Sequence, residues 1–258
     1  MRRLFTIALC GAVSVHCVAQ GLEDIFVETY AVSSVPGRPD EALTTYRIFA
    51  DLAEGYSMQM VYGDAKHDLK LITDTEFYND TLNGDKFGDR LNGNMLQQWP
   101  LAIDTWLTIG AASDMHSGVP KHLDPDGSIL TCPPYPGIGP SSAGSASSPP
   151  STLCAVDGMV RDTSRNEVVD FRCSTGYLHK VRGGTINTND GAWARLGGSR
   201  GTTSENMVLL AQITTTGTLS FQLNIQIAAP DRSVENHVHS APAEGEHTHP
   251  ALTFPRAR

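Results

Sequence analysis

Alternating apolar and polar positions are the dominant pattern of the chain, and they are clearest in residues 217–228. There the apolar side chains of Leu219, Phe221, Leu223, Ile225 and Ile227 alternate with the polar side chains of Ser220, Gln222, Asn224 and Gln226. Because successive side chains of a β-strand point to opposite faces of a sheet, this pattern predicts a strand with one buried face. The preceding segment, 207–213, is apolar at both sets of positions, and a turn-like Thr-Thr-Thr-Gly run joins the two. We therefore predict a hairpin whose first strand is the more deeply buried.

Further segments have the composition of strands, since they are rich in β-branched or aromatic residues and bounded by Gly, Pro, Asn or Asp. They are residues 25–32, 44–52, 56–62, 69–73 and 101–109, and the shorter stretches 168–172 and 192–196. No helical apolar stripe persists for three turns. We therefore expect an all-β fold with little helix, an antiparallel two-sheet β-sandwich of jelly-roll or immunoglobulin-like type. The pattern leaves the strand topology open.

The strand pattern is interrupted at two internal segments and at both ends of the chain. Residues 79–94 are dense in Asn, Asp and Gly, and residues 113–151 form a long Pro-, Gly- and Ser-rich insertion, so both are expected to be loops. Residues 1–19 combine two early arginines, an apolar run and small residues at positions 17 and 19, which is typical of a cleaved signal peptide. Residues 20–230 are expected to form one domain, and the polar, His-rich residues 231–258 a disordered tail.

The net charge of the chain limits the classes of partner that we expect it to bind. The 258 residues include 19 Lys and Arg against 28 Asp and Glu, for a formal net charge of -9. Nucleic acid and anionic membrane surfaces require a positive face, so neither is expected as the main partner. No later stretch approaches the roughly 20 apolar residues of a membrane-spanning helix. We expect a secreted or cell-surface protein without a membrane span.

The cysteines that follow the signal peptide are Cys132, Cys154 and Cys173. Outside the cytosol such thiols oxidise, and an odd number leaves one unpaired. A Cys132–Cys154 disulfide would tie the ends of the insertion, whereas a Cys154–Cys173 disulfide would tie the insertion to the following strand; we favour the first. The sequence contains no C-x-x-C spacing, which argues against a metal site at these cysteines. A nucleophilic Cys with a His base is the remaining alternative.

Four blocks of sequence carry a resemblance to a known family. They read GLEDIFVETYAV (21–32), TYRIFADLAEGYSMQMVYG (45–63), LKLITDTEFYND (69–80) and NDGAWARLGGSRGTTSENMVLLAQITTTGTLSFQLNIQIAAP (189–230). Together they resemble an uncharacterised domain of secreted Bacteroidota proteins, which often occurs in tandem copies and upstream of a type IX secretion sorting domain. The resemblance implies placement at the cell surface or outside the cell, and it assigns no activity. This sequence departs from the pattern in carrying one copy and no recognisable sorting domain after residue 230.

Two groups of residues have the chemistry of metal ligands. The tail contains the pairs His237 with His239 and His247 with His249, whose imidazoles, with nearby Glu244 and Glu246, suit Zn, Cu or Ni; the alternative is a solvated tail. The Asp124-Pro-Asp126-Gly-Ser segment, and Asp85 and Asp89 in the 79–94 loop, offer the hard oxygen ligands that Ca²⁺ prefers. Asp, Asn and Gly are also ordinary turn residues, which is the reading we favour. No cofactor is indicated, and Ca²⁺ is the ion to test first.

Sugar binding needs exposed aromatic faces beside planar amide or carboxylate groups. Trp193, in a Gly-rich run, and the polar strand face of Gln222, Asn224 and Gln226 are the candidates, whereas Trp106 is expected to pack beneath a loop. The alternative is that Trp193 is also buried and that the amide row is a solvated sheet face.

Catalytic motifs are missing from the sequence. It contains no H-E-x-x-H, G-x-S-x-G, P-loop or dinucleotide fingerprint, and carboxylate pairs drawn from Asp51, Glu54, Asp74, Glu76 or Asp104 are unspecific. We therefore expect no enzyme but an exported, noncatalytic structural, adhesive or matrix-associated protein, with glycans or other cell-surface proteins as partners. A carbohydrate-binding module is the alternative, and a glycan-active hydrolase a distant one.

Overall fold

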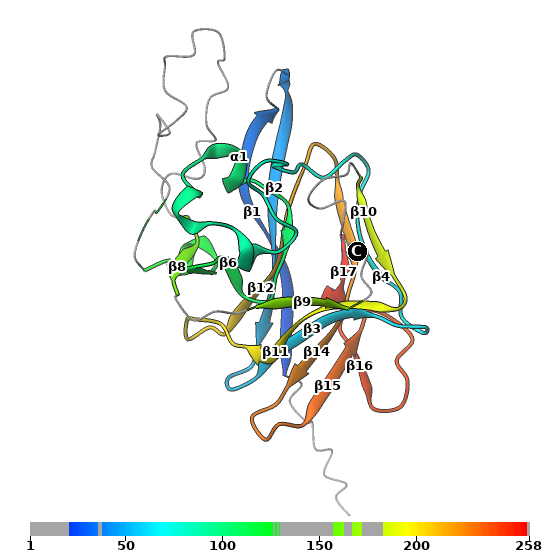
Figure 1. Ribbon diagram of the computed structural model, residues 1–258. Coiled ribbons are helices and arrows are strands. Elements are labelled where there is room, and N and C mark those ends of the chain that lie inside the picture. The colour runs from blue at the N-terminus through cyan, green and yellow to red at the C-terminus, as the bar shows by residue number, and fades with distance from the viewer. Residues whose placement is uncertain are drawn as a thin grey trace, which may run out of the picture.

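A computed structural model describes residues 21–35, 38–125, 127, 129, 157–162, 167–171 and 183–256 (Figure 1). Their strands form four sheets. In spatial order, the first contains β1 (Leu22–Val35), β2 (Arg38–Leu52), β12 (Met207–Thr215) and β5 (Trp106–Leu107), and the second β10 (Thr185–Thr188), β4 (Leu69–Thr73), β13 (Leu219–Gln222) and β17 (Thr253–Phe254). The third contains β16 (Glu246–Thr248), β15 (Val234–Val238), β14 (Asn224–Ala228), β3 (Ser57–Gly63), β11 (Gly191–Ser199) and β9 (Val168–Phe171), and the fourth β6 (Ala111–Ser113), β7 (His116–Gly118) and β8 (Met159–Arg161).

In the part of the chain that the structure describes, helix is confined to short turns, which confirms the expected all-β class. They are α1 (Trp99–Ala102), η1 (Gly88–Arg90), η2 (Gly93–Met95), η3 (Lys121–Leu123) and η6 (Pro250–Leu252). The two-sheet β-sandwich, however, is wrong. The four small sheets are arranged as a four-blade propeller rather than as two stacked layers. Three of these sheets combine strands from distant parts of the chain, and side-chain alternation alone does not specify such pairings.

The predicted hairpin of residues 207–228 is also wrong. β12 pairs with β2 and β5, whereas the following segment divides at Leu223 into β13, in the second sheet, and β14, in the third. The alternation continues across the division, because Leu219, Phe221, Ile225 and Ile227 are all buried. One sequence pattern therefore serves two sheets, and Leu223 marks the place where the chain passes from one to the other.

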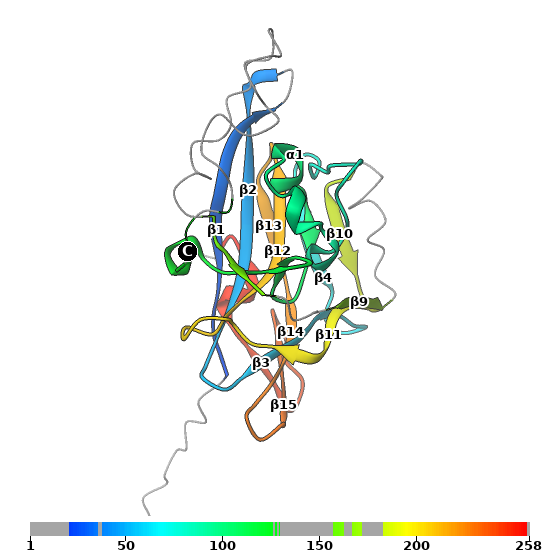
Figure 2. The same ribbon diagram turned by 60° about the vertical axis from the view of Figure 1, so that its left-hand side comes forward.

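The first sheet is buried on both faces. Neighbouring residues Leu209 and Leu210 of β12 belong to two different hydrophobic clusters, as do Ile48 and Phe49 of β2. This confirms that residues 207–213 form a deeply buried strand. Figure 2 shows the long hairpin of β1 and β2 extending beyond the other sheets at the end opposite β15.

Two further predictions need correction. Residues 101–109 were expected to be one strand, but α1 occupies 99–102 and only Trp106 and Leu107 are extended, because Pro100 fixes a helical φ at the start of α1. Residues 231–256 are folded rather than a disordered tail: β15 pairs with β14, β16 pairs in parallel with β15, and β17 pairs with β13. Val238 and Leu252 are fully buried, so this polar segment still anchors itself through a few apolar side chains.

Some predictions fall outside the described residues. They are the signal peptide at 1–19, most of the insertion at 113–151, and Cys132, Cys154 and Cys173. The described start of the insertion is not the predicted loop, because it contains β7, which pairs with β8, and η3. The loop at 79–94 is described; it contains no strand of its own and buries Phe87 and Leu91.

Candidate functional site

The third sheet places alternate side chains on two faces. Across its strands, Trp193, Val61 and Ile225 occupy one row of register and are fully buried in the main core. The neighbouring row contains Phe171, Ala192, Tyr62 and Asn224, whose side chains therefore lie on the opposite face. We call this opposite side the outer face. It carries a small apolar cluster of its own, made of Tyr62, Ala192, Val238 and the half-buried Met60.

A hollow of about 520 Å³ opens on the outer face, over β3, β9 and β11. Met60, Tyr62, Phe171, Ala192, two aspartates and two glycines line it; the aspartates are Asp170 and Asp190, and the glycines Gly63 and Gly191. Position 63 requires glycine, since a Cβ atom there would lie 2.0 Å from the backbone oxygen of Thr188. Phe171 is 51% exposed, so its ring is available at the edge. The hollow thus combines aromatic and apolar surface with an exposed acidic residue, Asp190. The Asp170 side chain lies on the other face of the sheet, because Asp170 pairs with the core residue Trp193.

The two aspartates differ in their surroundings. Asp170 Oδ2 accepts a hydrogen bond from Lys86 Nζ at 2.8 Å, so its charge is partly balanced. Asp190 is exposed at the turn that joins β10 and β11, where its backbone N–H donates to Thr188 Oγ1. Tyr62, between them and the C-terminal strands, has a raised pKa because of burial and of the negative charges of Glu246 and Asp64.

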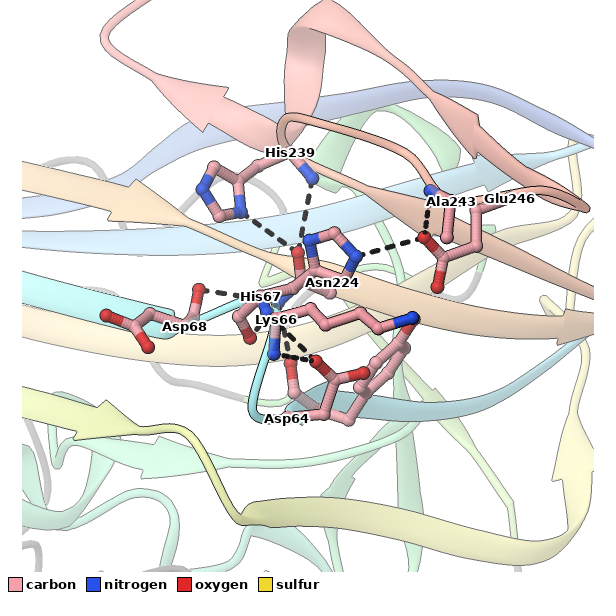
Figure 3. A network of polar contacts seen from close by, with 9 residues as sticks. Asp64, Lys66, His67, Asp68, Asn224, His239, Ala243 and Glu246 are labelled. Atoms are coloured by element: carbon pink, nitrogen blue, oxygen red, sulfur yellow. Dashed lines mark hydrogen bonds and ion pairs between the residues drawn. The ribbon is translucent and has the colours of Figure 1, made fainter.

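A network of polar contacts supports the Tyr62 side of the hollow (Figure 3). The Asn224 amide Nδ2 donates to the backbone oxygens of Tyr62 and His67, both at 3.1 Å. Asn224 Oδ1 in turn lies 2.9 Å from His239 Nδ1. His67 is also 2.9 Å from Glu246 Oε2, which links the β3–β4 turn to β16. The network fixes the end of β3 against the C-terminal segment, and so fixes the position of Tyr62.

The structure separates the residues that the sequence proposed for sugar binding. Trp193 is 1% exposed, and its indole N–H donates to the backbone oxygen of Thr108 at 3.1 Å, so it cannot stack on a ligand. Trp106 is buried as expected. The amide row is broken, because Gln222 lies in the second sheet and Asn224 is fully buried. Gln226 lies on the outer face and is partly exposed there, and its Nε2 donates to Asn236 Oδ1 at 3.0 Å.

Sequence reasoning missed Met60, Tyr62 and Phe171. All three lie in segments that were predicted to be strands, but the pattern of residues 57–63 does not show which face is buried. Met58 and Val61 are both fully buried although they are three residues apart, which breaks a strict alternation. Met60 lies between them in the sequence, and Tyr62 follows Val61. Pairing with β11 on one side and β14 on the other decides the face, and that pairing is not local in sequence.

The described aspartates that were proposed for calcium accept backbone N–H groups, both within turns and from distant segments. Asp85 accepts a hydrogen bond from the backbone N–H of Phe87, and Asp89 accepts one from the backbone N–H of Val168. Asp124 accepts hydrogen bonds from the backbone N–H groups of Gly127 and Gly158. Burial raises the pKa of Asp89, although the Val168 N–H and Arg90 oppose that shift. Asp126 is outside the described residues, and among the described ones no three or more His, Cys, Asp or Glu side chains form a group that could hold a metal ion. Calcium binding at residues 124–128 stays a prediction.

The four histidines proposed as ligands are distributed over separate contacts. His237 is fully buried, 3.1 Å from Glu235 Oε2, and its ring centroid is 5.2 Å from that of His247. His239 bonds to Asn224, and His249 accepts the Ala251 N–H at the start of η6. Burial lowers the pKa of His237, His239 and His249. His237, His239 and His249 therefore make hydrogen bonds within the fold, and metal binding by the four histidines stays a prediction.

Asp104 is a buried carboxyl with altered acidity. The Asp104 side chain is 1% exposed, and this burial raises its pKa well above the usual value. The hydrogen bond that its Oδ1 accepts from the Asp80 N–H at 2.7 Å opposes that shift. Its Oδ2 faces Gly84, where a Cβ atom would lie only 2.3 Å away. The carboxyl closes the 80–84 turn and has no open path to a substrate.

Comparison of the chain with protein-family models, with curated proteins and with solved structures finds no match. Among the described residues, no helix has the length and apolar character that a bilayer crossing requires. The hollow on the outer face is therefore the feature from which a function can be argued.

Proposed function

We propose that this protein is an exported, noncatalytic binding module that takes a sugar chain in the hollow of the outer face. The observation that carries the proposal is that the half-exposed ring of Phe171 and the side chain of Tyr62 line one open hollow that has Asp190 at its edge. The apolar faces of pyranose rings stack on aromatic surface, and their hydroxyls need hydrogen-bonding groups beside it. Such binding would give the protein the adhesive or matrix-associated role that the sequence predicts.

The outer face extends the same chemistry beyond the hollow. Met60, Gln226, Asn236 and Glu246 follow one another in register across β3, β14, β15 and β16. Adjacent strands are about 4.8 Å apart, so this row provides polar groups along a path of roughly 15 Å. A chain of sugar units lying across the strands would contact the aromatic hollow at one end and the amides at the other.

Phe171→Ala tests the proposal. The ring is half exposed, so its removal should leave the melting temperature nearly unchanged, while the loss of stacking should weaken glycan binding about tenfold. Leu82→Ala is the matched control, because Leu82 is an 88% exposed apolar side chain in the 80–84 turn. A glycan array identifies the ligands, and titration calorimetry measures the affinities. If no glycan binds the wild type, or if Phe171→Ala binds as tightly as Leu82→Ala, the proposal is wrong.

A further inference from the structure

The hollow has an apolar floor, which consists of Met60, Tyr62 and Ala192. Tyr62 of β3 and Ala192 of β11 pair in register on the outer face, and both are largely buried there. The half-buried Met60 lines the hollow beside them and belongs to the same apolar cluster. An apolar group of a ligand gains free energy on such a surface because it leaves water, whereas a hydroxyl group loses hydrogen bonds to water. The floor therefore favours a ligand that carries a small apolar group.

The hydroxyl of Tyr62 is a polar group on this floor. Among the described residues it has no hydrogen-bond partner, whereas the hydroxyl of Tyr56 donates to Glu235 Oε1 at 3.1 Å. Burial raises the pKa of Tyr62, and the negative charges of Glu246 and Asp64 raise it further, so the phenol stays protonated. A largely buried O–H donor of this kind gains from an acceptor that a ligand brings to it.

We propose that the hollow recognises the acetamido group of N-acetylhexosamine units, and that Tyr62 selects this group. This inference rests on the proposed function and names the class of its sugar. An acetamido group combines a carbonyl oxygen, which can accept from the Tyr62 hydroxyl, with a methyl group, which can pack on Met60 and Ala192. A hydroxyl at the same position of the sugar ring has no apolar group to place on the floor. The half-exposed ring of Phe171, at the edge, stacks on the sugar ring itself.

The test compares tetramers of β-1,4-linked N-acetylglucosamine and of β-1,4-linked glucose, which differ only in the group at C2. Wild type should bind the acetylated tetramer about tenfold more tightly in titration calorimetry, because one hydrogen bond and one buried methyl group are gained. Tyr62→Phe keeps the ring and removes the hydroxyl. It should reduce the preference to about threefold and leave the affinity for the glucose tetramer unchanged. Tyr46→Phe is the matched control, because Tyr46 is a half-buried tyrosine of β2, in the first sheet. Melting curves establish that both variants are folded.

The outcomes separate this inference from the proposed function. Equal affinity for the two tetramers, or a preference that Tyr62→Phe leaves intact, overturns the selection of the acetamido group. If Phe171→Ala still weakens glycan binding in that case, the proposed function stands without it. A glycan array on which only sugars without acetamido groups bind also overturns this inference and supports the function. If neither tetramer and no glycan of the array binds the wild type, both proposals are wrong.

Discussion

The Asn224 side chain, which is fully buried, donates to the backbone oxygen of Tyr62 across 3.1 Å. The same amide group donates to the His67 oxygen, and its Oδ1 accepts the backbone N–H of His239 at 3.2 Å. A single polar side chain thus joins β14, the end of β3 and the segment after β15. Because Tyr62 lines the hollow, this amide links the packing of the fold to the shape of the hollow.

We expect Asn224→Ala to destabilise the protein by about 2–4 kcal/mol, because it leaves buried carbonyl and N–H groups without partners. The variant should also weaken glycan binding, since the end of β3 is no longer held. Urea unfolding measures the first effect and titration calorimetry the second. Asn187→Ala is the control, because Asn187 is exposed on β10. A loss of less than about 0.5 kcal/mol would show that the network has no structural importance.

The sequence predicted many strands well but could not predict how they pair. Residues 69–73 coincide with β4, and the alternation of 217–228 identifies the buried apolar positions but not the fully buried Asn224. The same alternation cannot indicate that Leu223 separates two sheets, because both sheets bury the same side of the strand pattern. Pairing of β3 with β11 and β14 links positions more than a hundred residues apart, and no local signal encodes it.

The candidate site was less predictable than the fold. Trp193 was a reasonable choice as an indole in a Gly-rich run, but its position in register with Val61 turns it into the core. The C-terminal segment was judged disordered from its polarity, yet contacts such as that of His67 with Glu246 satisfy its polar groups once the sheets are formed. Polar composition predicts disorder only where such partners are missing.

Asp104 should make the protein less stable as the pH rises. Burial raises the pKa of its carboxyl in the folded state above the ordinary 3.8, so the folded state keeps a proton that the unfolded state has lost. The stability contributed by this group is present below pH 3.8 and is lost as the pH rises through the folded pKa. Within that window each pH unit lowers the free energy of unfolding by up to about 1.4 kcal/mol.

Asp104→Asn tests this linkage. The amide oxygen can still accept the Asp80 N–H, and the side chain no longer ionises. We expect the variant to gain stability relative to wild type between acidic and neutral pH, measured by urea unfolding at a series of pH values. Glu54→Gln should follow the wild-type curve, because Glu54 is exposed. A constant difference between Asp104→Asn and wild type at all pH values would mean that the carboxyl does not titrate differently on folding.

The buried histidines should act in the opposite sense. Burial lowers the pKa of His237 from the ordinary 6.5, an effect that Glu235 opposes and that His247 and His249 reinforce. The unfolded state therefore takes up the proton first as the pH falls, and stability that is present above pH 6.5 is lost as the pH falls through the folded pKa. His237→Gln, which can still donate to Glu235, should flatten this part of the stability curve. His122→Gln, at an exposed site, is the control and should leave the stability curve unchanged. If His237→Gln also leaves the curve unchanged, the prediction is wrong.

Arg47 is a buried cation that joins two sheets. Its Nε donates to Gln212 Oε1 at 3.0 Å, its Nη1 donates to the backbone oxygen of Gly158 at 2.9 Å, and its Cζ lies 3.6 Å from the centroid of the Tyr30 ring. Lysine has one compact donor group and no planar face. It therefore cannot make both hydrogen bonds and stack on Tyr30.

We expect Arg47→Lys to lower the free energy of unfolding by about 3 kcal/mol, since a buried charge would lose most of its partners. The effect should be greatest at β8, which Arg47 joins to β2 through Gly158, so hydrogen exchange of the Met159–Arg161 amides should accelerate before that of β12. Arg200→Lys, at an exposed site, should change neither measurement. Unaltered exchange at β8 in Arg47→Lys would mean that the guanidinium does not hold this strand, and that backbone pairing with β7 is sufficient.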